Sequence, residues 1–513
     1  MKYAGGALLP TLRIDRGSSR PIVVQLVSAL RELVLSGVLE PGQRLPSSRT
    51  FARDHGISRT TAISVYESLT AEGLIVSRVG SGSHVSDVLR GKARTLTAGS
   101  SGHAKQPTRL ASLAERASEQ FFPRLSHPTQ PRPFVTGLPA LDMFPMPLWA
   151  KLTARHWRSA RGHALGYPEP GGLAELRQAI ATHLRANRGV VCDPEEVFIF
   201  NGAQEAFNHI GNTLLDPGDP VWFENPGPIG ARNSLLASGA RLVPVPVDEE
   251  GINVAAGLDA EPNFRLAFVT PSHQHPLGAV MSLQRRFELL QAAERADAWI
   301  VEDDYDGEYY YSGHPPPTLK SVDTVGRVIY VGTFSKSLFP ALRIAFMVVS
   351  GPLADVFGRI ARATLQGAST MLQAVTASFI EEGHFSSHIR RMRKIYTERH
   401  EVLIDAARHR LAGGIDVMRA ESGIQTVGHL LTGHDEAAVA EAAADRDVIV
   451  APLSRFSIAP ITAKGFAIGF STSTPAEIRA GVDRLAAAID SLRPVNGPPE
   501  FPQWPVRSSR APS

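Results

Sequence analysis

The feature that most constrains the fold is a regular alternation of short apolar runs with longer helical segments, from Phe134 to about Arg493. The apolar runs have the length of buried strands and read VFIF, PVWFE, LAFVT, AWIVED, VIYVG and IAFMVV. Strands that alternate with helices build parallel sheets, because each helix carries the chain back across a face of the sheet. The pattern therefore predicts an α/β domain with a largely parallel sheet.

The chain is long enough for more than one domain, since 513 residues exceed what one hydrophobic core usually serves. Residues 18–87 show helical periodicity with short breaks and are expected to form a first domain. Residues 88–133 are rich in Gly, Ser, Thr, Pro and Arg, which predicts a mostly flexible linker with one amphipathic stretch near 110–122. The α/β domain spans 134–493, and the proline-rich tail 494–513 is expected to be disordered.

The single cysteine, Cys192, cannot form an intrachain disulfide, which favours a reducing compartment. Without partner ligands it cannot build a thiolate metal site either, and no metal is expected. The sequence contains no apolar stretch of membrane-spanning length, and its N-terminus has no signal-peptide core. These features predict a cytoplasmic protein.

Basic charge is concentrated at the N-terminus, where residues 1–95 contain 13 Lys and Arg against 7 Asp and Glu. Such an excess favours binding of a polyanion. Pro21 fits the first position of a helix that ends at Gly37, and its apolar residues fall on one face. After Gly73, the segment LIVSRVGSGSHVSD predicts a hairpin with a Gly-Ser-Gly tip, which would form a wing.

Two further helices are predicted between the first helix and the hairpin. Ser47 or Ser48 can cap one that runs to Gly56, and Ser58 opens the next. In this third helix, four apolar residues form a buried stripe: Ala62, Val65, Tyr66 and Leu69. The residues that then face outward are Arg59, Thr60, Thr61 and Ser64. Small hydroxyls and an arginine at a helix start suit the major groove of DNA, where hydroxyls hold phosphates and Arg reads a guanine edge.

The run PGQRLPSSRTFARDHGISRTTAISVYESLTAEGLIVSRVGSGSHV resembles the GntR-type winged helix over nearly its full length, including the GxRLPSxR and SRxT signatures. The resemblance implies a set of contacts to double-stranded DNA: Arg44, Ser47, Arg49, Ser58, Arg59, Thr60, Thr61 and Gly82. The alternative is a three-helix domain whose arginines form a solvated face, since winged helices also dock proteins.

Three segments of the α/β domain carry polar groups where strands end. FNGAQEAFNHI leads from a strand through Gly202 into a helix start, where free N–H groups can bind a phosphate. AWIVEDDYDGEYYY turns acidic at the end of a strand, and in RVIYVGTFSKSLFPALRIAF Lys336 follows a strand and a hydroxyl-rich turn. These are the groups that pyridoxal 5'-phosphate (PLP) requires, namely an amine, a carboxylate, a hydroxyl donor and a phosphate cradle.

Together these segments resemble the fold-type I aminotransferases, and specifically the MocR subfamily of GntR regulators, over essentially all of residues 134–490. The resemblance implies a PLP domain with a smaller C-terminal α/β subdomain, in which Lys336 forms the Schiff base and is the one catalytic residue. Asp303 would pair with the pyridine nitrogen, with Asp304 as its rival, and Tyr305 would donate to the phenolate oxygen. The phosphate would be held by Gly202, Ala203, Gln204, Thr333, Ser335 and Arg343.

Three positions depart from the family pattern. Pro228 replaces an aromatic ring expected near the cofactor, and His275 stands where relatives often have Tyr or Phe. His275 would either stack on PLP or be a structural histidine. Ala467 stands where aminotransferases carry the arginine that clamps a substrate carboxylate, and loss of that clamp removes the orientation that transamination needs.

The leading interpretation is a transcriptional regulator in which PLP, or PLP with an amine or amino acid, changes the arrangement of the DNA-binding heads. An active aminotransferase with a DNA-binding appendage is the second interpretation, and a dead enzyme scaffold used for dimerisation is the third. Ala467 argues against the second, and the intact Lys336 and phosphate set argue against the third. A homodimer that binds repeated half-sites of an operator is expected.

Overall fold

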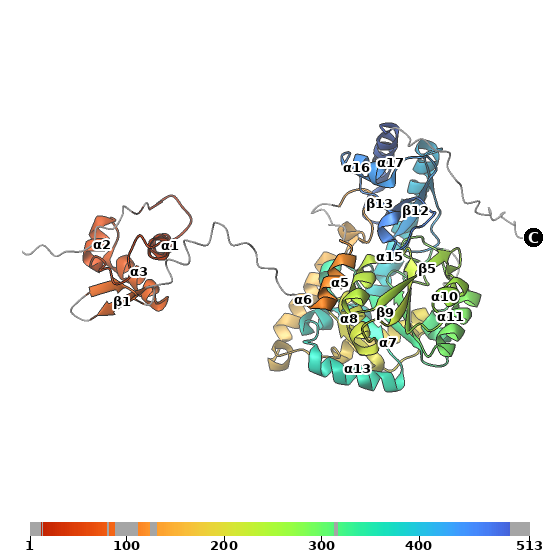
Figure 1. Cartoon of the computed structure of the whole chain (residues 1–513), viewed down its shortest axis with the longest axis horizontal. Helices are drawn as coiled ribbons and strands as arrows, with labels where there is room; N and C mark the ends of the chain where they lie inside the picture. Colours follow the sequence, from red (N-terminus) through yellow and green to blue (C-terminus); the bar gives the residue numbers. More distant parts are fainter. Residues whose placement is uncertain are drawn as a thin grey trace, which may run out of the picture. The chain divides into compact units, whose positions relative to one another are not determined.

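The computed structural model describes Leu12 and residues 14–78, 82–87, 111–123, 131–311 and 316–492. The chain divides into two compact units, Met1–Leu110 and Ala111–Ser513 (Figure 1). The tip of the predicted wing at 79–81, most of the predicted linker and the predicted tail lie outside the described residues. Among the helices that are described, none is long and apolar enough to cross a membrane.

The first unit is a winged helix built from three helices and a hairpin. Its elements are α1 (Ile22–Leu35), α2 (Ser48–Asp54), α3 (Arg59–Ala71), β1 (Ile75–Arg78) and β2 (Gly82–Val85). The strands pair antiparallel, from Ile75 opposite Val85 to Arg78 opposite Gly82. The predicted stripe of α3 is buried as expected, and it packs with Phe51 and with residues of α1 in one core.

The first helix begins one residue later than the sequence predicts. Pro21 is the N-cap of α1 rather than its first residue, since its ψ of 142° is extended. Its carbonyl still accepts the amide of Gln25 at 3.2 Å, so the proline closes the first turn from outside the helix. The second helix is capped by Ser47, whose side chain accepts the amide of Thr50. This settles the choice between Ser47 and Ser48.

The second unit is built on an eight-stranded sheet with the strand order β3-β10-β9-β8-β7-β4-β5-β6. The strands are β3 (Val197–Phe200), β4 (Pro220–Asn225), β5 (Arg241–Asp248), β6 (Gly251–Ile252), β7 (Leu266–Val269), β8 (Trp299–Asp304), β9 (Val328–Thr333) and β10 (Ala345–Val348). Strands β5, β4, β7, β8 and β9 run parallel, whereas β10 is antiparallel to both of its neighbours. The prediction of a mostly parallel sheet is therefore confirmed.

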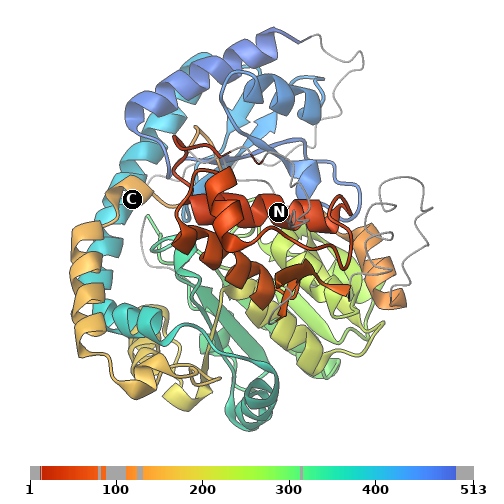
Figure 2. The ribbon, with the colours of Figure 1, turned by 90° about the vertical axis from the view of Figure 1, so that its left-hand side faces the viewer.

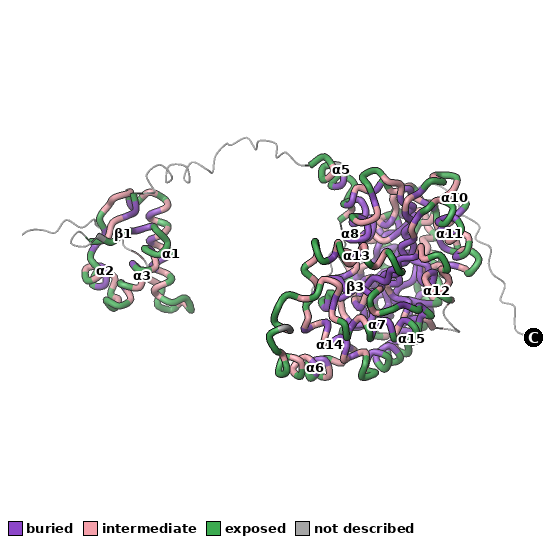
Figure 3. Tube along the Cα trace, turned by 90° about the horizontal axis from the view of Figure 1, so that it is seen from below, coloured by how far each residue is buried: buried purple, intermediate pink, exposed green. Residues whose placement is uncertain are grey.

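Helices of this unit pack with the sheet, and buried residues gather in the interior of the unit (Figure 3). The helices of this part are α5 (Ser112–Gln120), α6 (Met146–Ser159), α7 (Ala174–Arg188), α8 (Ala203–Leu214), α9 (Ile229–Ala237), α10 (Val254–Ala260), α11 (Leu283–Arg295), α12 (Leu319–Val322), α13 (Gly351–Thr364) and α14 (Thr370–Glu381). Short 3-10 turns occupy η2 (Leu141–Met143), η3 (Gly162–Leu165), η4 (Pro194–Glu196) and η5 (Pro340–Leu342). The amphipathic stretch near 110–122 forms α5, which packs on α9 as part of this unit.

The chain ends in a smaller α/β subdomain with a four-stranded antiparallel sheet of order β11-β12-β14-β13 (Figure 2). Its elements are α15 (His384–Arg410), β11 (Ile415–Val417), β12 (Gln425–Leu430), α16 (Glu436–Ala444), β13 (Ala451–Pro452), η6 (Leu453–Phe456), β14 (Gly465–Gly469) and α17 (Pro475–Asp490). Phe134, at the start of the predicted α/β domain, forms a bridge with Gly469 and is fully buried. This contact fixes the segment just before Gly137, whose carbonyl oxygen accepts from Lys336, to the last residue of β14.

Candidate functional site

Lys336 lies in the turn after β9, where the parallel strands present their carboxyl ends. Its Nζ donates a hydrogen bond to the carbonyl oxygen of Gly137 at 2.6 Å. A Cβ on Gly137 would lie only 3.1 Å from that nitrogen, and the φ of this glycine is +78°. Glycine therefore provides both the backbone conformation and the space beside the lysine.

Asp303 and Asp304 lie at the end of β8, where successive side chains point to opposite faces of the sheet. Asp304 makes contacts within the protein. Its Oδ2 forms an ion pair with Arg188 Nη2 at 2.6 Å and accepts a hydrogen bond from the hydroxyl of Tyr330 at 2.5 Å. The Oδ1 atoms of Asp303 and Asp304 are both buried without a hydrogen-bond partner, so the two residues differ in the partners that hold Oδ2 of Asp304. Burial and the charges of nearby carboxylates raise the pKa of Asp303 well above its usual range, while Lys336 lowers it.

A buried carboxylate without a partner is costly, and such groups concentrate where a ligand is bound. Asp303 therefore fits a cationic partner that the protein itself does not provide, such as a protonated pyridine nitrogen. Asp304 does not fit this role because Arg188 and Tyr330 already bind its Oδ2 atom. The structure thus favours Asp303 over its rival.

This assignment predicts opposite effects for two matched variants. Asp304→Asn leaves the buried guanidinium of Arg188 without its counter-charge and should lower the free energy of unfolding by about 3 kcal/mol. Asp303→Asn, in PLP-free protein, replaces a buried carboxyl group whose Oδ1 has no hydrogen-bond partner and should leave the free energy of unfolding unchanged or raise it. Urea unfolding of the two variants measures both values. Equal losses of stability would contradict a ligand-binding role for Asp303.

A cradle for an anion lies at the start of α8. Gly202 caps this helix with a φ of +95°, so the first amides, those of Ala203 and Gln204, are at the open end of the helix. The guanidinium of Arg343 covers Gly202, since a Cβ there would lie 2.7 Å from Arg343 Nη2. The same nitrogen donates to the carbonyl oxygen of Asn201 at 2.7 Å, which fixes its position.

Two hydroxyls lie in the turn between β9 and Lys336. Thr333 Oγ1 donates to Ser335 Oγ at 3.1 Å and accepts the amide of Ser335 at 3.2 Å. Hydroxyls, helix amides and a guanidinium are the donors that bind phosphate in proteins. The residues predicted to hold a phosphate therefore include a complete set of donor types, placed at the ends of β3, β9 and the turn before β10.

Tyr305 is the next residue after β8, and its hydroxyl oxygen lies 3.1 Å from His273 Nδ1. His273 also contacts Asp306, with 2.9 Å between Nδ1 and Oδ2. The ring of His275 lies edge-on to Tyr305 with 5.8 Å between centroids. Burial first, and then the charges of Lys336 and His273, lower the pKa of His275 to about 3, so its ring is neutral.

Ala467, predicted to replace the arginine of a carboxylate clamp, lies in an apolar cluster. Ala467 on β14 is fully buried, and it packs with Ile229, Ala451 and Phe456. Phe456 borders the residues described above, because its ring lies 5.0 Å from that of His275 between centroids. Its carbonyl oxygen also accepts the amide of Gly227, which precedes Pro228. These neighbours give Ala467 an apolar surrounding rather than a polar one.

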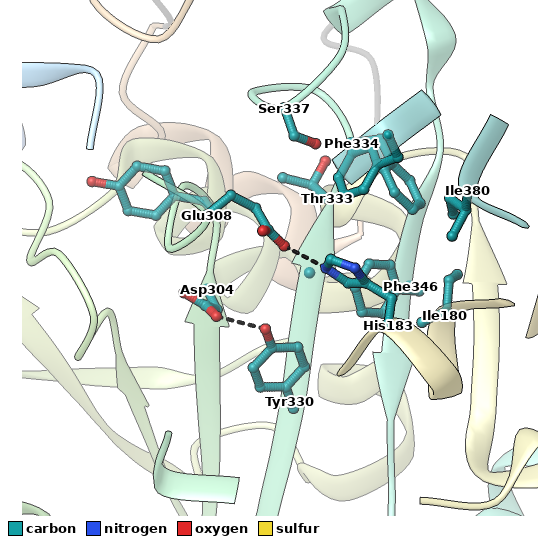
Figure 4. Close-up of a pocket in the computed structure, with 13 residues that line it drawn as sticks. Ile180, His183, Asp304, Glu308, Tyr330, Thr333, Phe334, Ser337, Phe346 and Ile380 are labelled. Carbon is teal, nitrogen blue, oxygen red and sulfur yellow. Dashed lines mark hydrogen bonds and ion pairs between the residues drawn. The ribbon is translucent and has the colours of Figure 1, made fainter. Parts of the chain in front are cut away.

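A small pocket lies near the end of β9, lined by His183, Glu308, Tyr330 and Phe334 among others (Figure 4). His183 Nε2 lies 2.8 Å from Glu308 Oε1, and Figure 4 shows this pair beside the contact between Asp304 and Tyr330. Tyr305 and Thr333 also line this pocket, so it borders the candidate site.

The sequence does not predict several residues that the structure brings into the site, namely Gly137, Arg188, His273 and Asp306. His273 and Asp306 follow β7 and β8, in the segments SHQHPLG (272–278) and EDDYDGE (302–308), where polar residues at two strand ends signal a contact. Gly137 and Arg188 are distant from these motifs in the chain, and nothing local marks them. Their roles depend on tertiary packing.

In the first unit, the predicted DNA contacts lie at the starts of α2 and α3 and on the wing. Arg59 and Thr60 are exposed in the first turn of α3. Ser58 caps this helix by accepting the amide of Thr61 at 3.0 Å, and the two hydroxyls lie 2.8 Å apart. The hydroxyl of Thr61 is thus already engaged within the helix cap.

The remaining predicted contacts are also accessible. Arg44 is exposed and lies beside Gly82 at the start of the wing strand β2, where a Cβ on Gly82 would be 3.5 Å from Arg44 Nε. Ser47 and Arg49 are exposed at the start of α2. An exposed arginine beside a wing and two capped helix starts form a surface that can hold a polyanion.

Two family models match the chain. Residues 23–85 match the bacterial regulatory proteins of the gntR family, and residues 137–485 match the class I and II aminotransferases. The chain is similar to the probable rhizopine catabolism regulatory protein MocR of Rhizobium meliloti, with 41% identity over 94% of this chain and 96% of that protein. It is also similar to the pyridoxine biosynthesis transcriptional regulator PdxR of Corynebacterium glutamicum, with 30% identity over 75% of this chain and 78% of that protein.

Among solved structures, the chain is similar to LysN, an α-aminoadipate aminotransferase of Thermus thermophilus that was crystallised with N-(5'-phosphopyridoxyl)-L-leucine. The identity is 28%, the TM-score is 0.64, and the match covers 74% of this chain and 95% of LysN. The larger unit therefore has the fold of a PLP-dependent aminotransferase, and the smaller unit has that of a GntR-type DNA-binding domain.

Proposed function

Because this chain belongs to the MocR subfamily of GntR-family transcriptional regulators, and so is a DNA-binding regulator with an aminotransferase-like domain, we propose that PLP held at Lys336 controls its binding to DNA. The observation that carries the proposal is the buried Oδ1 of Asp303, which has no partner although Lys336 is near enough to lower the pKa of its carboxyl group. A protonated pyridine ring would supply the missing partner.

The residues of the larger unit fit PLP in type and in position. Asp303 would hold the pyridine nitrogen, Tyr305 would donate to the phenolate oxygen, and the start of α8 with Arg343 would hold the phosphate. When bound, PLP supplies an aldehyde that joins an amine and a ring that withdraws electrons. His275 is neutral and buried, which suits either packing against the ring or a structural role.

The segment that leads from the DNA-binding unit enters the larger unit beside this site. The amide of Phe122 donates to Asn233 Oδ1 at 3.2 Å, and Asn233 Nδ2 donates to the carbonyl oxygen of Phe122 at 2.9 Å. The guanidinium groups of Arg232 and Arg455 both lie over the ring of Phe122, 5.4 Å and 5.0 Å from its centroid. The phenyl group also packs on the apolar cluster around Ala467.

This arrangement gives the site a physical connection to the linker. Phe456 contacts His275 on one side and belongs to the cluster under Phe122 on the other. A ligand that moved η6 or the start of α9 would move the anchor of the connecting segment with it. We infer that occupancy of the site reaches the DNA-binding unit by this route, in a homodimer that reads repeated half-sites.

The effector is a small amine or amino acid, or PLP itself, and the protein senses it rather than turning it over. Ala467 offers no charge to a substrate carboxylate, so an amine that displaced Lys336 from the aldehyde of bound PLP would not be oriented for proton transfer. Addition of a recognised amine to PLP-loaded protein should change the visible spectrum while no keto acid accumulates. Absorbance together with a keto-acid assay measures both. Turnover at about 1 per second or faster would favour the aminotransferase alternative instead.

A further inference from the structure

Tyr305 shares one ring nitrogen of His273 with a buried carboxylate. The hydroxyl oxygen of Tyr305 lies 3.1 Å from His273 Nδ1, and Asp306 Oδ2 lies 2.9 Å from the same atom. The side chains of His273 and Asp306 are each only 1% exposed. A ring nitrogen either carries a proton and donates it or offers a lone pair and accepts, so its state fixes the role of both neighbours.

Two observations place the proton on Nδ1. An ionised carboxylate can only accept hydrogen bonds, so Asp306 requires a donor at this nitrogen. The other nitrogen, Nε2 of His273, is buried without a hydrogen-bond partner, and a proton there would be an unsatisfied donor. These contacts therefore place a proton on Nδ1 of His273 and none on Nε2. The oxygen of Tyr305 can then only accept from His273, and its own proton points elsewhere.

We propose that Asp306 and His273 are positioning residues, which keep the proton of Tyr305 directed to the phenolate oxygen of PLP by denying it another acceptor. This inference rests on the proposed function, because it requires PLP at Lys336. The local sequences around His273 and Asp306 do not assign this role to either residue. It follows from the shared nitrogen alone.

The pair is enclosed by the C-terminal subdomain, where Gly423 lies just before β12. A Cβ on this glycine would lie 2.1 Å from His273 Nδ1 and 2.5 Å from Asp306 Oδ2, and its φ is +80°. The amide of Gly423 donates to the carbonyl oxygen of Tyr309 at 2.7 Å, which holds the loop in place. A larger residue at 423 would displace His273 and Asp306, so the glycine maintains the contacts that position the hydroxyl of Tyr305.

Other charged groups also act on Tyr305. Burial raises the pKa of its phenol well above the usual range, and the carboxylates of Asp306, Asp303, Glu224 and Asp304 raise it further. The phenol of Tyr305 therefore keeps its proton, and can donate a hydrogen bond, throughout the titration described below. Asp303, Glu224 and Asp304 are unchanged in the variants below. Differences in the titration midpoint between these variants therefore report on Nδ1 of His273.

The test is a spectrophotometric pH titration of PLP-loaded protein. A donor to the phenolate oxygen lowers the pH at which the nitrogen that joins PLP to Lys336 loses its proton, because the oxygen then shares that proton less. In Asp306→Leu, Nδ1 of His273 loses the carboxylate that holds its proton, and in every molecule in which Nδ1 is bare its lone pair accepts the proton of Tyr305. The midpoint of the titration should rise by about one pH unit, the effect of one hydrogen bond to a charged group.

The double variant distinguishes positioning from general disruption. Asp306→Leu combined with His273→Phe removes the carboxylate and also the competing lone pair, so the midpoint should return toward the wild-type value. Tyr305→Phe should raise the midpoint and make it insensitive to Asp306→Leu. The proposal is wrong if Asp306→Leu leaves the midpoint unchanged, or if the double variant stays as far shifted as the single one.

A measurement on the unaltered chain covers the case in which Asp306→Leu does not fold. In protein labelled with nitrogen-15 histidine, the signals of His273, identified by their loss in His273→Phe, should show a protonated Nδ1 and a bare Nε2. The reverse tautomer would overturn the proposal. Protein with no visible PLP band contradicts the proposed function and this role together, whereas a normal band without the predicted shift contradicts only this role.

Discussion

Lys336→Ala should abolish the visible absorbance of the PLP-loaded protein. Lys336 is held at a strand end by Gly137 and lies near Asp303 and His275, so its amine is placed where the cofactor's aldehyde would bind. Removal of the amine removes the covalent link and the yellow colour with it, while the phosphate cradle at α8 is left intact. The absorbance spectrum of protein that was incubated with PLP and then freed of unbound PLP by desalting measures this loss.

The matched control is Lys394→Ala, which removes an exposed lysine from α15 in the same unit. This variant should keep the full visible band, and both variants should keep the secondary structure of the wild type by circular dichroism. A coloured Lys336→Ala protein, or loss of colour in the control alone, would show that another amine carries the cofactor.

Arg59→Ala should weaken operator binding by about 1–3 kcal/mol, which is roughly 5- to 150-fold in the dissociation constant. Arg59 is exposed in the first turn of α3, beside a helix start that Ser58 caps. An arginine at this position can reach a base edge while the helix amides hold a phosphate. Titration of the operator at fixed salt measures the change, and the PLP absorbance should be unaffected.

The control for this experiment is Arg31→Ala in the same unit. It removes the same charge, but the Arg31 guanidinium is already paired with Glu72, with 2.6 Å between Nη2 and Oε1. Operator affinity should therefore change much less in this variant. If both variants lose the same affinity, the effect of Arg59 would be one of net charge, and α3 would not be the helix that reads the bases.

The sequence predicts those parts of the fold that are repeated or locally marked. All the quoted apolar runs form strands of the eight-stranded sheet, because buried parallel strands need continuous apolar side chains. β5, with the sequence RLVPVPVD, is absent from those runs. Its two prolines argue against a central strand, and the structure tolerates them near the edge of the sheet, where only the short β6 lies beyond.

The residues of the candidate site also fall into two groups, those that a local motif predicts and those that only the structure reveals. Lys336, Asp303 and the start of α8 follow from motifs at strand ends, since the ends of parallel strands converge by topology alone. The choice between Asp303 and Asp304 required the structure, because only packing shows that Arg188 and Tyr330 occupy Asp304. The partnership of His273 with Asp306 and the anchoring of Phe122 by Asn233 join residues distant in the chain, and no local pattern encodes them.

The most direct test of the account is an operator-binding titration carried out at one salt concentration with PLP-free protein, with PLP-loaded protein and with PLP plus candidate amines. The account predicts that the dissociation constant differs between these states in the wild type, and that Lys336→Ala, which lacks the covalent link, does not show the same difference. In Phe122→Ala the difference should shrink, although the visible PLP band is retained, because the connecting segment has lost its anchor. Identical affinities in every state of the wild type would contradict control of DNA binding by PLP.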